Sequence, residues 1–212
     1  MKAAAGFRVH SGWAAIVAVC VEKGAPRVLA RERVQLVKTF TYKFRQPYHT
    51  AEKLALAPAR EFVAGVEKES QELAFRAIHG LRAELQNQGF ELTCCALLLA
   101  SGRPLPSFEK ILASHALIHT ADGEHFREAI SCAANCCGLE TLGVKEKELL
   151  DSAKQALRVQ PAVLQRRLTE FGRPFGAPWS QDEKFATLAA WLSLTQHTFG
   201  NDSHGKKEKA KN

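Results

Sequence analysis

The 212-residue sequence predicts an α/β protein with one mixed β-sheet, in which a three-strand antiparallel meander joins two parallel strands and helices cover both faces. Two observations favour this class. Residues 7–45 carry apolar and alternating stretches joined by short connections, which is typical of a meander. Residues 92–100 form a continuous apolar run, typical of a strand buried on both faces, and helical segments alternate with strands around it.

Three strands are predicted within the first 45 residues. They are residues 7–21 (one strand or a bent strand pair), 27–37 and 38–45, with a turn at residues 24–26. The third strand is predicted from strict alternation, which places Phe40, Tyr42 and Phe44 on one face. This aromatic row is expected to face into the sheet core, although aromatic rows on strands also stack on bases.

The remainder of the chain is predicted to alternate helices with two more strands. Residues 51–88 carry a helical pattern that Pro58 divides and Gly89 ends. Ser107 and Ser180 are suitable N-caps for later helices. In chain order the further elements are strand 92–100, helices 107–116 and 122–137, strand 139–144, helices 145–157 and 161–171, and a last helix from residue 180 to residue 196.

Length and charge set limits on organisation and partners. Residues 1–196 are expected to form one domain, and residues 197–212 a disordered, lysine-rich tail. The net charge of +7 is only mildly basic, because the last eight residues contribute three of these charges. Such a charge is compatible with nucleic-acid binding but does not identify it.

Cysteine usage and hydropathy predict a cytoplasmic protein without membrane association. The six cysteines lie in apolar surroundings and lack a CxxC spacing, which favours reduced, buried thiols over a zinc motif. The apolar run from Trp13 to Val21 is too short for a membrane helix. Lys2 before it would also suit a signal peptide, but the β-branched residues of the run favour a strand.

Two segments resemble a known family. Gly6-Phe7-Arg8-Val9-His10-Ser11-Gly12-Trp13-Ala14-Ala15 resembles the first strand of RuvC-type Holliday-junction resolvases. The segment 182–191, Asp-Glu-Lys-Phe-Ala-Thr-Leu-Ala-Ala-Trp, resembles the last helix of that family. The order of strands and helices between them also matches, so the resemblance implies a ribonuclease H-like fold over about residues 6–196.

The same resemblance implies that nuclease chemistry is absent. Ribonuclease H-like nucleases hold two magnesium ions with carboxylates from the first strand, the fourth strand and the last helix, and magnesium requires such oxygen ligands. At the first-strand position this chain carries Arg8, or Val9 if the alignment shifts by one residue, and no aspartate precedes Asp122. The fourth strand ends Leu99-Ala100-Ser101 without a glutamate. In the last helix Asp182 matches the first acid, but Phe185 replaces the second.

Four polar residues are candidates for catalysis. His10 follows the first strand, Asp182 begins the last helix, and His119 and Glu124 lie between them in the sequence. If these side chains converge, they could perform acid–base chemistry or bind a transition metal. The alternative is purely structural, with Asp122 and Asp182 favouring helix N-termini and the histidines bonding to core groups.

Metal binding has no specific motif here, so no cofactor is assigned, although a divalent metal is compatible with the residues. His115 and His119 are four residues apart and share a helix face. Cys132 and Cys136 have the same spacing, but the small apolar residues around them favour core packing.

A basic surface is the candidate for nucleic-acid contact. Its residues are Arg31, Arg33, Lys43 and Arg45, with the tail lysines adding attraction. Three functional hypotheses follow. The first is a nuclease-inactive domain that binds nucleic acid or a nucleic-acid-processing protein. The second is a hydrolase-type enzyme with a rebuilt His/Glu/Asp site at the same pole of the sheet. The third is a structural or interaction domain.

Overall fold

A five-stranded mixed sheet forms the centre of the protein in the computed structural model, which describes residues 1–100 and 104–204, with side chains described up to residue 195. The strands are β1 (Lys2–His10), β2 (Trp13–Glu22), β3 (Ala25–Gln35), β4 (Glu91–Leu99) and β5 (Glu140–Lys145), in the order β3-β2-β1-β4-β5. β1, β2 and β3 are antiparallel neighbours, whereas β4 is parallel to both β1 and β5. The predicted sheet class, with residues 92–99 in an interior strand, is confirmed.

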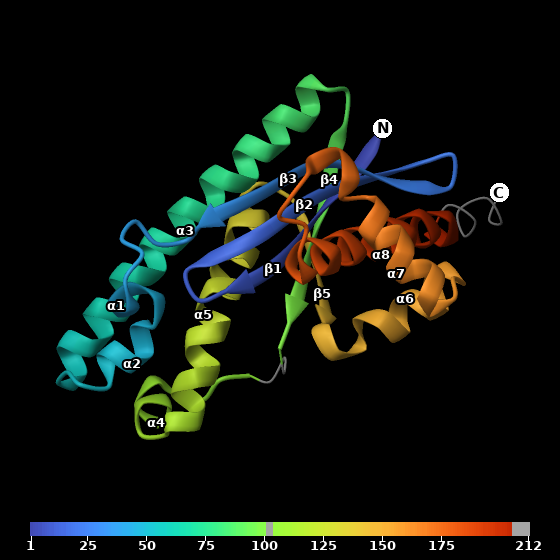
Figure 1. Cartoon of the computed structure of the whole chain (residues 1–212). Coiled ribbons are helices and arrows are strands. Elements are labelled where there is room, and N and C mark those ends of the chain that lie inside the picture. The colour runs from blue at the N-terminus through green and yellow to red at the C-terminus, as the bar shows by residue number, and fades with distance from the viewer. Residues whose placement is uncertain (101–103, 205–212) are drawn as a thin grey trace, which may run out of the picture.

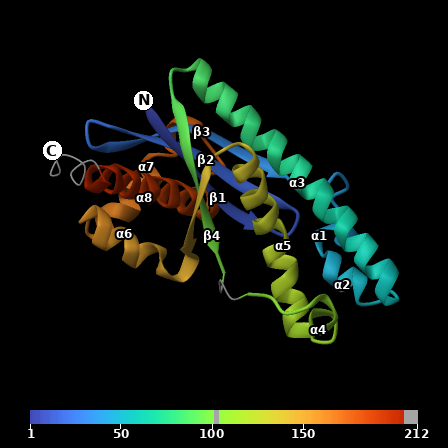
Figure 2. The same cartoon turned by 180° about the vertical axis from the view of Figure 1, so that it is seen from behind.

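Helices cover both faces of this sheet, as predicted (Figures 1 and 2). The helices are α1 (Tyr42–Arg45), α2 (Pro47–Ala51), α3 (Leu56–Asn87), α4 (Phe108–Leu112), α5 (His115–Cys136), α6 (Leu149–Leu157), α7 (Pro161–Glu170) and α8 (Gln181–His204), with 3-10 turns η1 (Glu146–Glu148) and η2 (Arg173–Phe175). α3 and α5 pack on one face with Phe7, Ile16 and Leu97 in the core. α8, supported by α6 and α7, packs on the other face. No helix in residues 1–100 and 104–204 is long and apolar enough to span a membrane.

Close packing of α8 on β1 determines where the ends of these elements meet. A Cβ atom on Gly6 would lie only 1.8 Å from the carbonyl oxygen of Ala186, so only glycine permits this approach. Residues alternate along a strand, so Arg8 and His10 lie on the same face of β1 as Gly6. The last polar residues of β1 therefore meet the first turn of α8.

The predicted third strand is wrong. The first predicted strand, 7–21, is a pair, β1 and β2, and the meander is completed by β3. After β3 the chain leaves the sheet, and residues 42–45 of the predicted strand 38–45 form helix α1 instead. Phe40 and Tyr42 are 40% and 59% exposed, so the row as a whole does not face the sheet core, and Phe44 alone of the three packs against it. Alternation over eight residues did not distinguish a strand from a loop followed by one helical turn.

Several helix boundaries also differ from prediction. Pro58 lies in the first turn of α3, where its missing N–H is not needed, and so does not divide a helix. Asp122 is buried in the interior of α5 and does not cap a helix. α8 continues to His204, past its predicted end at residue 196, because extending an established helix is easier than starting one. Ser101 and residues 205–212 of the predicted tail lie outside the described residues.

The cysteine prediction is confirmed in part. All six cysteines are free, and Cys20, Cys94, Cys95 and Cys137 are buried. Burial raises the pKa of the Cys94 and Cys95 thiols, so neither is a ready thiolate nucleophile. Cys136 is exposed and Cys132 only half-buried, so the expected core packing of that pair is wrong: they lie on the outward side of α5 near its end.

Candidate functional site

An arginine occupies the position on β1 where the resemblance placed a metal-binding acid. The Arg8 guanidinium donates to Glu146 through Nε (3.2 Å) and Nη2 (2.6 Å), and to Asp182 Oδ1 through Nη1 (2.6 Å). The Arg8 side chain is only 17% exposed. Burial lowers the pKa of Arg8, but both carboxylates more than compensate and raise the pKa above its ordinary value. Arg8 is therefore a permanent cation between two acids.

The fold brings these three residues together from distant parts of the chain. β1 and β5 are both parallel to β4, so their carboxyl ends reach the same edge of the sheet, and Glu146 directly follows β5. Asp182 lies in the first turn of α8. Ser180 begins that helix as predicted: its Oγ accepts from the Asp182 N–H at 3.1 Å, while Glu183 accepts from the Ser180 N–H at 2.7 Å, a capping box.

Phe185, which stands where the family's second acid is expected in the last helix, also contacts Arg8. The Arg8 guanidinium carbon lies 5.2 Å from the centre of the Phe185 ring, within cation–π range. The two positions at which the resemblance predicts acids therefore contact each other as a cation–aromatic pair. Of the acids that the resemblance predicts, only Asp182 is present. Glu146 is a second carboxylate that the sequence analysis did not identify. It could have been found from its position directly after a strand that is parallel to β4.

A flat stack of side chains adjoins this network at the turn between β1 and β2. His10 Nε2 lies 2.8 Å from Asp182 Oδ1. The His10 ring stacks on Trp13 with the ring centres 4.3 Å apart and an interplanar angle of 11°. The Arg33 guanidinium covers the same Trp13 ring at 3.7 Å. Trp13, Arg33 and Asp182 also line a neighbouring pocket of about 380 Å³.

The four basic residues predicted for nucleic-acid contact differ in their surroundings. Arg31 lines the same pocket as Arg33 and donates to the carbonyls of Gly176 and Pro178, in the loop before α8. Arg45 donates through Nε to the Ser11 carbonyl at 3.0 Å, in the β1–β2 turn. Lys43 lies over the Phe44 and Phe62 rings. Arg33 and Lys43 are exposed and hydrogen-bond to no described carbonyl or carboxylate, so of these four residues they are the two most available to a ligand.

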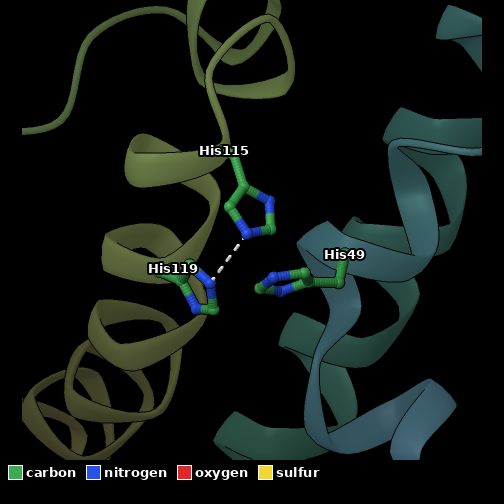
Figure 3. Close-up of side chains that lie close together, drawn as sticks. All are labelled: His49, His115 and His119. Carbon is green, nitrogen blue, oxygen red and sulfur yellow. Dashed lines mark hydrogen bonds between the residues drawn. The ribbon is translucent and has the colours of Figure 1, made fainter.

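The structure divides the four predicted catalytic residues. His10 and Asp182 are in contact, as expected. His119 belongs instead to a histidine cluster with His49 and His115, between α2 and α5 (Figure 3). Glu124 pairs with its helix neighbour Arg127 at 3.3 Å, although it lies near the histidine cluster in the sequence.

A buried carboxylate adjoins the histidine cluster. Asp122 accepts from the backbone N–H of Tyr48 at 2.7 Å and from Nδ1 of His49, both in α2. Burial raises the pKa of Asp122, and these hydrogen bonds only partly offset the effect. Asp122 therefore ties the short helix α2 to α5.

His125, the next histidine in α5, is a separate case. Its side chain is buried, and its Nε2 atom has no hydrogen-bond partner among the described residues. Burial lowers the pKa of His125 to about 4, so the ring is neutral at pH 7. His125 is therefore a source of pH-dependent stability.

Solved structures of RuvC from Thermus thermophilus are similar to this chain. One of them is RuvC in complex with a Holliday junction substrate. It matches this chain with a TM-score of 0.55 at 15% sequence identity, and the match covers 94% of this chain and 97% of that one. With another Thermus thermophilus RuvC structure the TM-score is 0.51 at 16% identity, covering 93% and 96%. No family model matches the sequence, and no curated protein matches it either. The fold is thus RuvC-like, which confirms the predicted ribonuclease H-like class.

Proposed function

We propose that this protein is a nucleic-acid-binding domain of RuvC-like fold in which an arginine-centred ion-pair network replaces the nuclease centre. The observation that carries the proposal is Arg8, which pairs with both Glu146 and Asp182. A two-metal nuclease needs carboxylates that are free to bind cations. Here the guanidinium already satisfies both acids, and its charge repels a divalent ion from the same place.

Nucleic-acid binding is supported by the surroundings of this network. The RuvC structure with the higher TM-score of the two above carries a Holliday junction substrate. In this chain Arg31 and Arg33 lie on one face of the edge strand β3, beside the loop into α8. His10 and Arg33 both cover the Trp13 ring, so the exposed guanidinium plane of Arg33 at the end of this stack is the surface on which an unpaired base could stack. The alternative partner is a nucleic-acid-processing protein. The six free cysteines favour the cytoplasm as the place where the protein acts.

Titration of labelled four-way-junction, duplex and single-stranded oligonucleotides at several salt concentrations tests this proposal. With four or five phosphate contacts, affinity should fall by roughly two to three orders of magnitude between 50 and 200 mM salt. Arg33→Ala/Lys43→Ala should weaken binding and reduce the slope of log affinity against log salt by about 0.7–0.9 per lost contact. The control Lys68→Ala/Arg76→Ala removes two exposed charges from α3 and should change neither.

Nuclease activity is measured on the same substrates with magnesium. We expect no cleavage, because Arg8 occupies the metal position. Cleavage that EDTA and Asp182→Ala both abolish would contradict the loss of nuclease chemistry. Absence of binding at low salt, or binding indifferent to salt and to Arg33→Ala/Lys43→Ala, would overturn the nucleic-acid proposal and leave an interaction domain as the better hypothesis.

A further inference from the structure

The histidine cluster lies apart from the Arg8 network and is not used by the proposed function. His115 and His119 are separated by one helical turn at the start of α5, so their side chains project from the same face. Their Nε2 atoms are 3.1 Å apart, and both residues are exposed (Figure 3). The two Nε2 atoms are directed toward each other in a hydrogen bond, and a metal ion bound by both would replace the proton between them.

His49 completes this arrangement from the opposite side. It comes from α2, is buried, and points between the other two rings (Figure 3). The His49 ring centre lies 4.4 Å from that of His119 and 5.4 Å from that of His115. One candidate ligand atom from each of the three residues lies within 4.8 Å of the others.

Asp122 determines which nitrogen of His49 is available. Its carboxylate accepts from Nδ1 of His49, so Nε2 is the nitrogen left for a ligand. A histidine that donates its other ring N–H to a carboxylate is the usual arrangement at metal sites, because the carboxylate fixes the ring and raises the basicity of the ligating nitrogen. Besides this bond to Asp122, the His49 ring packs edge-on against both other imidazoles of the cluster.

We propose that His49, His115 and His119 bind a divalent transition-metal ion of the zinc type, with Asp122 as the positioning residue for His49. Tetrahedral zinc with nitrogen ligands at about 2.0–2.1 Å separates those nitrogens by about 3.4 Å, close to the 3.1 Å between His115 and His119. The candidate nitrogen of His49 lies within 4.8 Å of the other two, so metal binding requires the exposed His115 and His119 side chains to rotate toward it. Imidazole ligands select zinc, cobalt, nickel or copper over magnesium, so this site is chemically distinct from a two-magnesium nuclease centre.

The fourth coordination position of this site faces solvent. His115 and His119 are exposed, whereas His49 and Asp122 close the protein side. Three histidine ligands with one open position is the ligand count of catalytic zinc sites, where the fourth ligand is water or substrate. The metal would also link α2 to α5, adding to the hydrogen bonds from Asp122.

Cobalt titration of the full chain, after removal of metal by a chelator, tests the site directly. We expect one equivalent of Co²⁺ to give the visible absorption of a tetrahedral nitrogen site, and one equivalent of Zn²⁺ to displace it. His115→Ala and His119→Ala should each weaken binding by more than about 100-fold, and Asp122→Asn by about 10–100-fold. His79→Ala is the matched control, because His79 is an exposed helix histidine outside the cluster.

Thermal unfolding provides a second measurement that does not depend on absorption. Zinc at 100 times its Kd should raise the Tm by about 5–10 °C in the native chain and in His79→Ala, but not in His119→Ala. Since His119 is exposed, that variant should fold normally without metal. Three outcomes would each overturn the assignment. They are binding that persists in His115→Ala and His119→Ala, the absence of stoichiometric binding, and thiolate-to-cobalt charge-transfer bands that indicate Cys132 and Cys136. None of these outcomes bears on the Arg8 network.

Discussion

Replacing Arg8 by alanine should lower the free energy of unfolding by about 3 kcal/mol, a value that follows from the burial of its partners. The Arg8 and Asp182 side chains are 17% and 21% exposed, so most of this pair is removed from water. Breaking a fully buried pair from one side costs about 3–5 kcal/mol, whereas an exposed pair contributes about 0–1 kcal/mol. Glu146 is 37% exposed, so screening reduces its share. The contact with Phe185 adds about 0.5–1 kcal/mol.

Urea unfolding at pH 7 measures this loss, and a double-mutant cycle separates the ion pair from packing. In Arg8→Ala two carboxylates remain without their shared cation, so adding Asp182→Asn should relieve part of the destabilisation. The coupling energy between the two substitutions should therefore be at least about 1 kcal/mol. Arg8→Lys should fall between wild type and Arg8→Ala, because a lysine keeps the charge but cannot donate to both acids from one planar group.

The matched control for this experiment is Arg76→Ala. Arg76 is an exposed arginine of α3, and its loss should change stability by less than about 0.5 kcal/mol. If Arg8→Ala matches this control, or if its effect adds to that of Asp182→Asn without coupling, the guanidinium does not stabilise the site through its ion pairs.

Two further predictions concern His125 and Gly6. The free energy of unfolding should fall by about 3 kcal/mol as the pH drops from 6.5 to about 4. The reason is that the unfolded chain binds a proton at His125, whereas the folded chain, in which the pKa of His125 is lowered to about 4, does not. In urea unfolding, His125→Leu should make stability nearly independent of pH over this range, and an unchanged pH dependence would exclude His125 as its source. Gly6→Ala should cost about 3 kcal/mol or more, since the new methyl would collide with the Ala186 carbonyl. Gly65→Ala, in an open position of α3, should instead stabilise the protein by up to about 1 kcal/mol. Equal effects of Gly6→Ala and Gly65→Ala would refute the close contact between β1 and α8.

The fold was predictable where the sequence pattern reflects burial on a sheet. The run in β4 is apolar because the strand is covered by α3 and α5 on one side and α8 on the other. Local patterns failed where tertiary contacts outweigh them. Residues 38–45 alternate like a strand, but β3 pairs with β2 and the chain then turns away into α1 and α2. Aspartate commonly caps helices, but the carboxylate of Asp122 is buried against Tyr48 and His49 of α2.

The candidate site was only half predictable for the same reason. The sequence shows that Arg8 stands where the resemblance predicts an acid, but it does not show the pairing of Arg8 with Glu146 and Asp182, which lie 138 and 174 residues away. The grouping of His10, His119, Glu124 and Asp182 assumed one site. The structure places His119 with His49, a residue that no sequence motif singled out, because α2 packs on α5.

The Arg8 network bears on how this pole of the sheet would meet a nucleic acid under the proposed function. Acidic residues repel phosphates until divalent cations neutralise them, so an acidic pole needs metal before a backbone can approach. Here the single positive charge of Arg8 offsets half of the charge of Glu146 and Asp182, and Arg31 and Arg33 add positive charge beside them. Under the proposed function, a phosphate backbone should therefore approach without a bound metal. It follows that nucleic-acid affinity should be the same in EDTA and in magnesium at equal ionic strength, and a requirement for magnesium would argue for a metal at this pole after all.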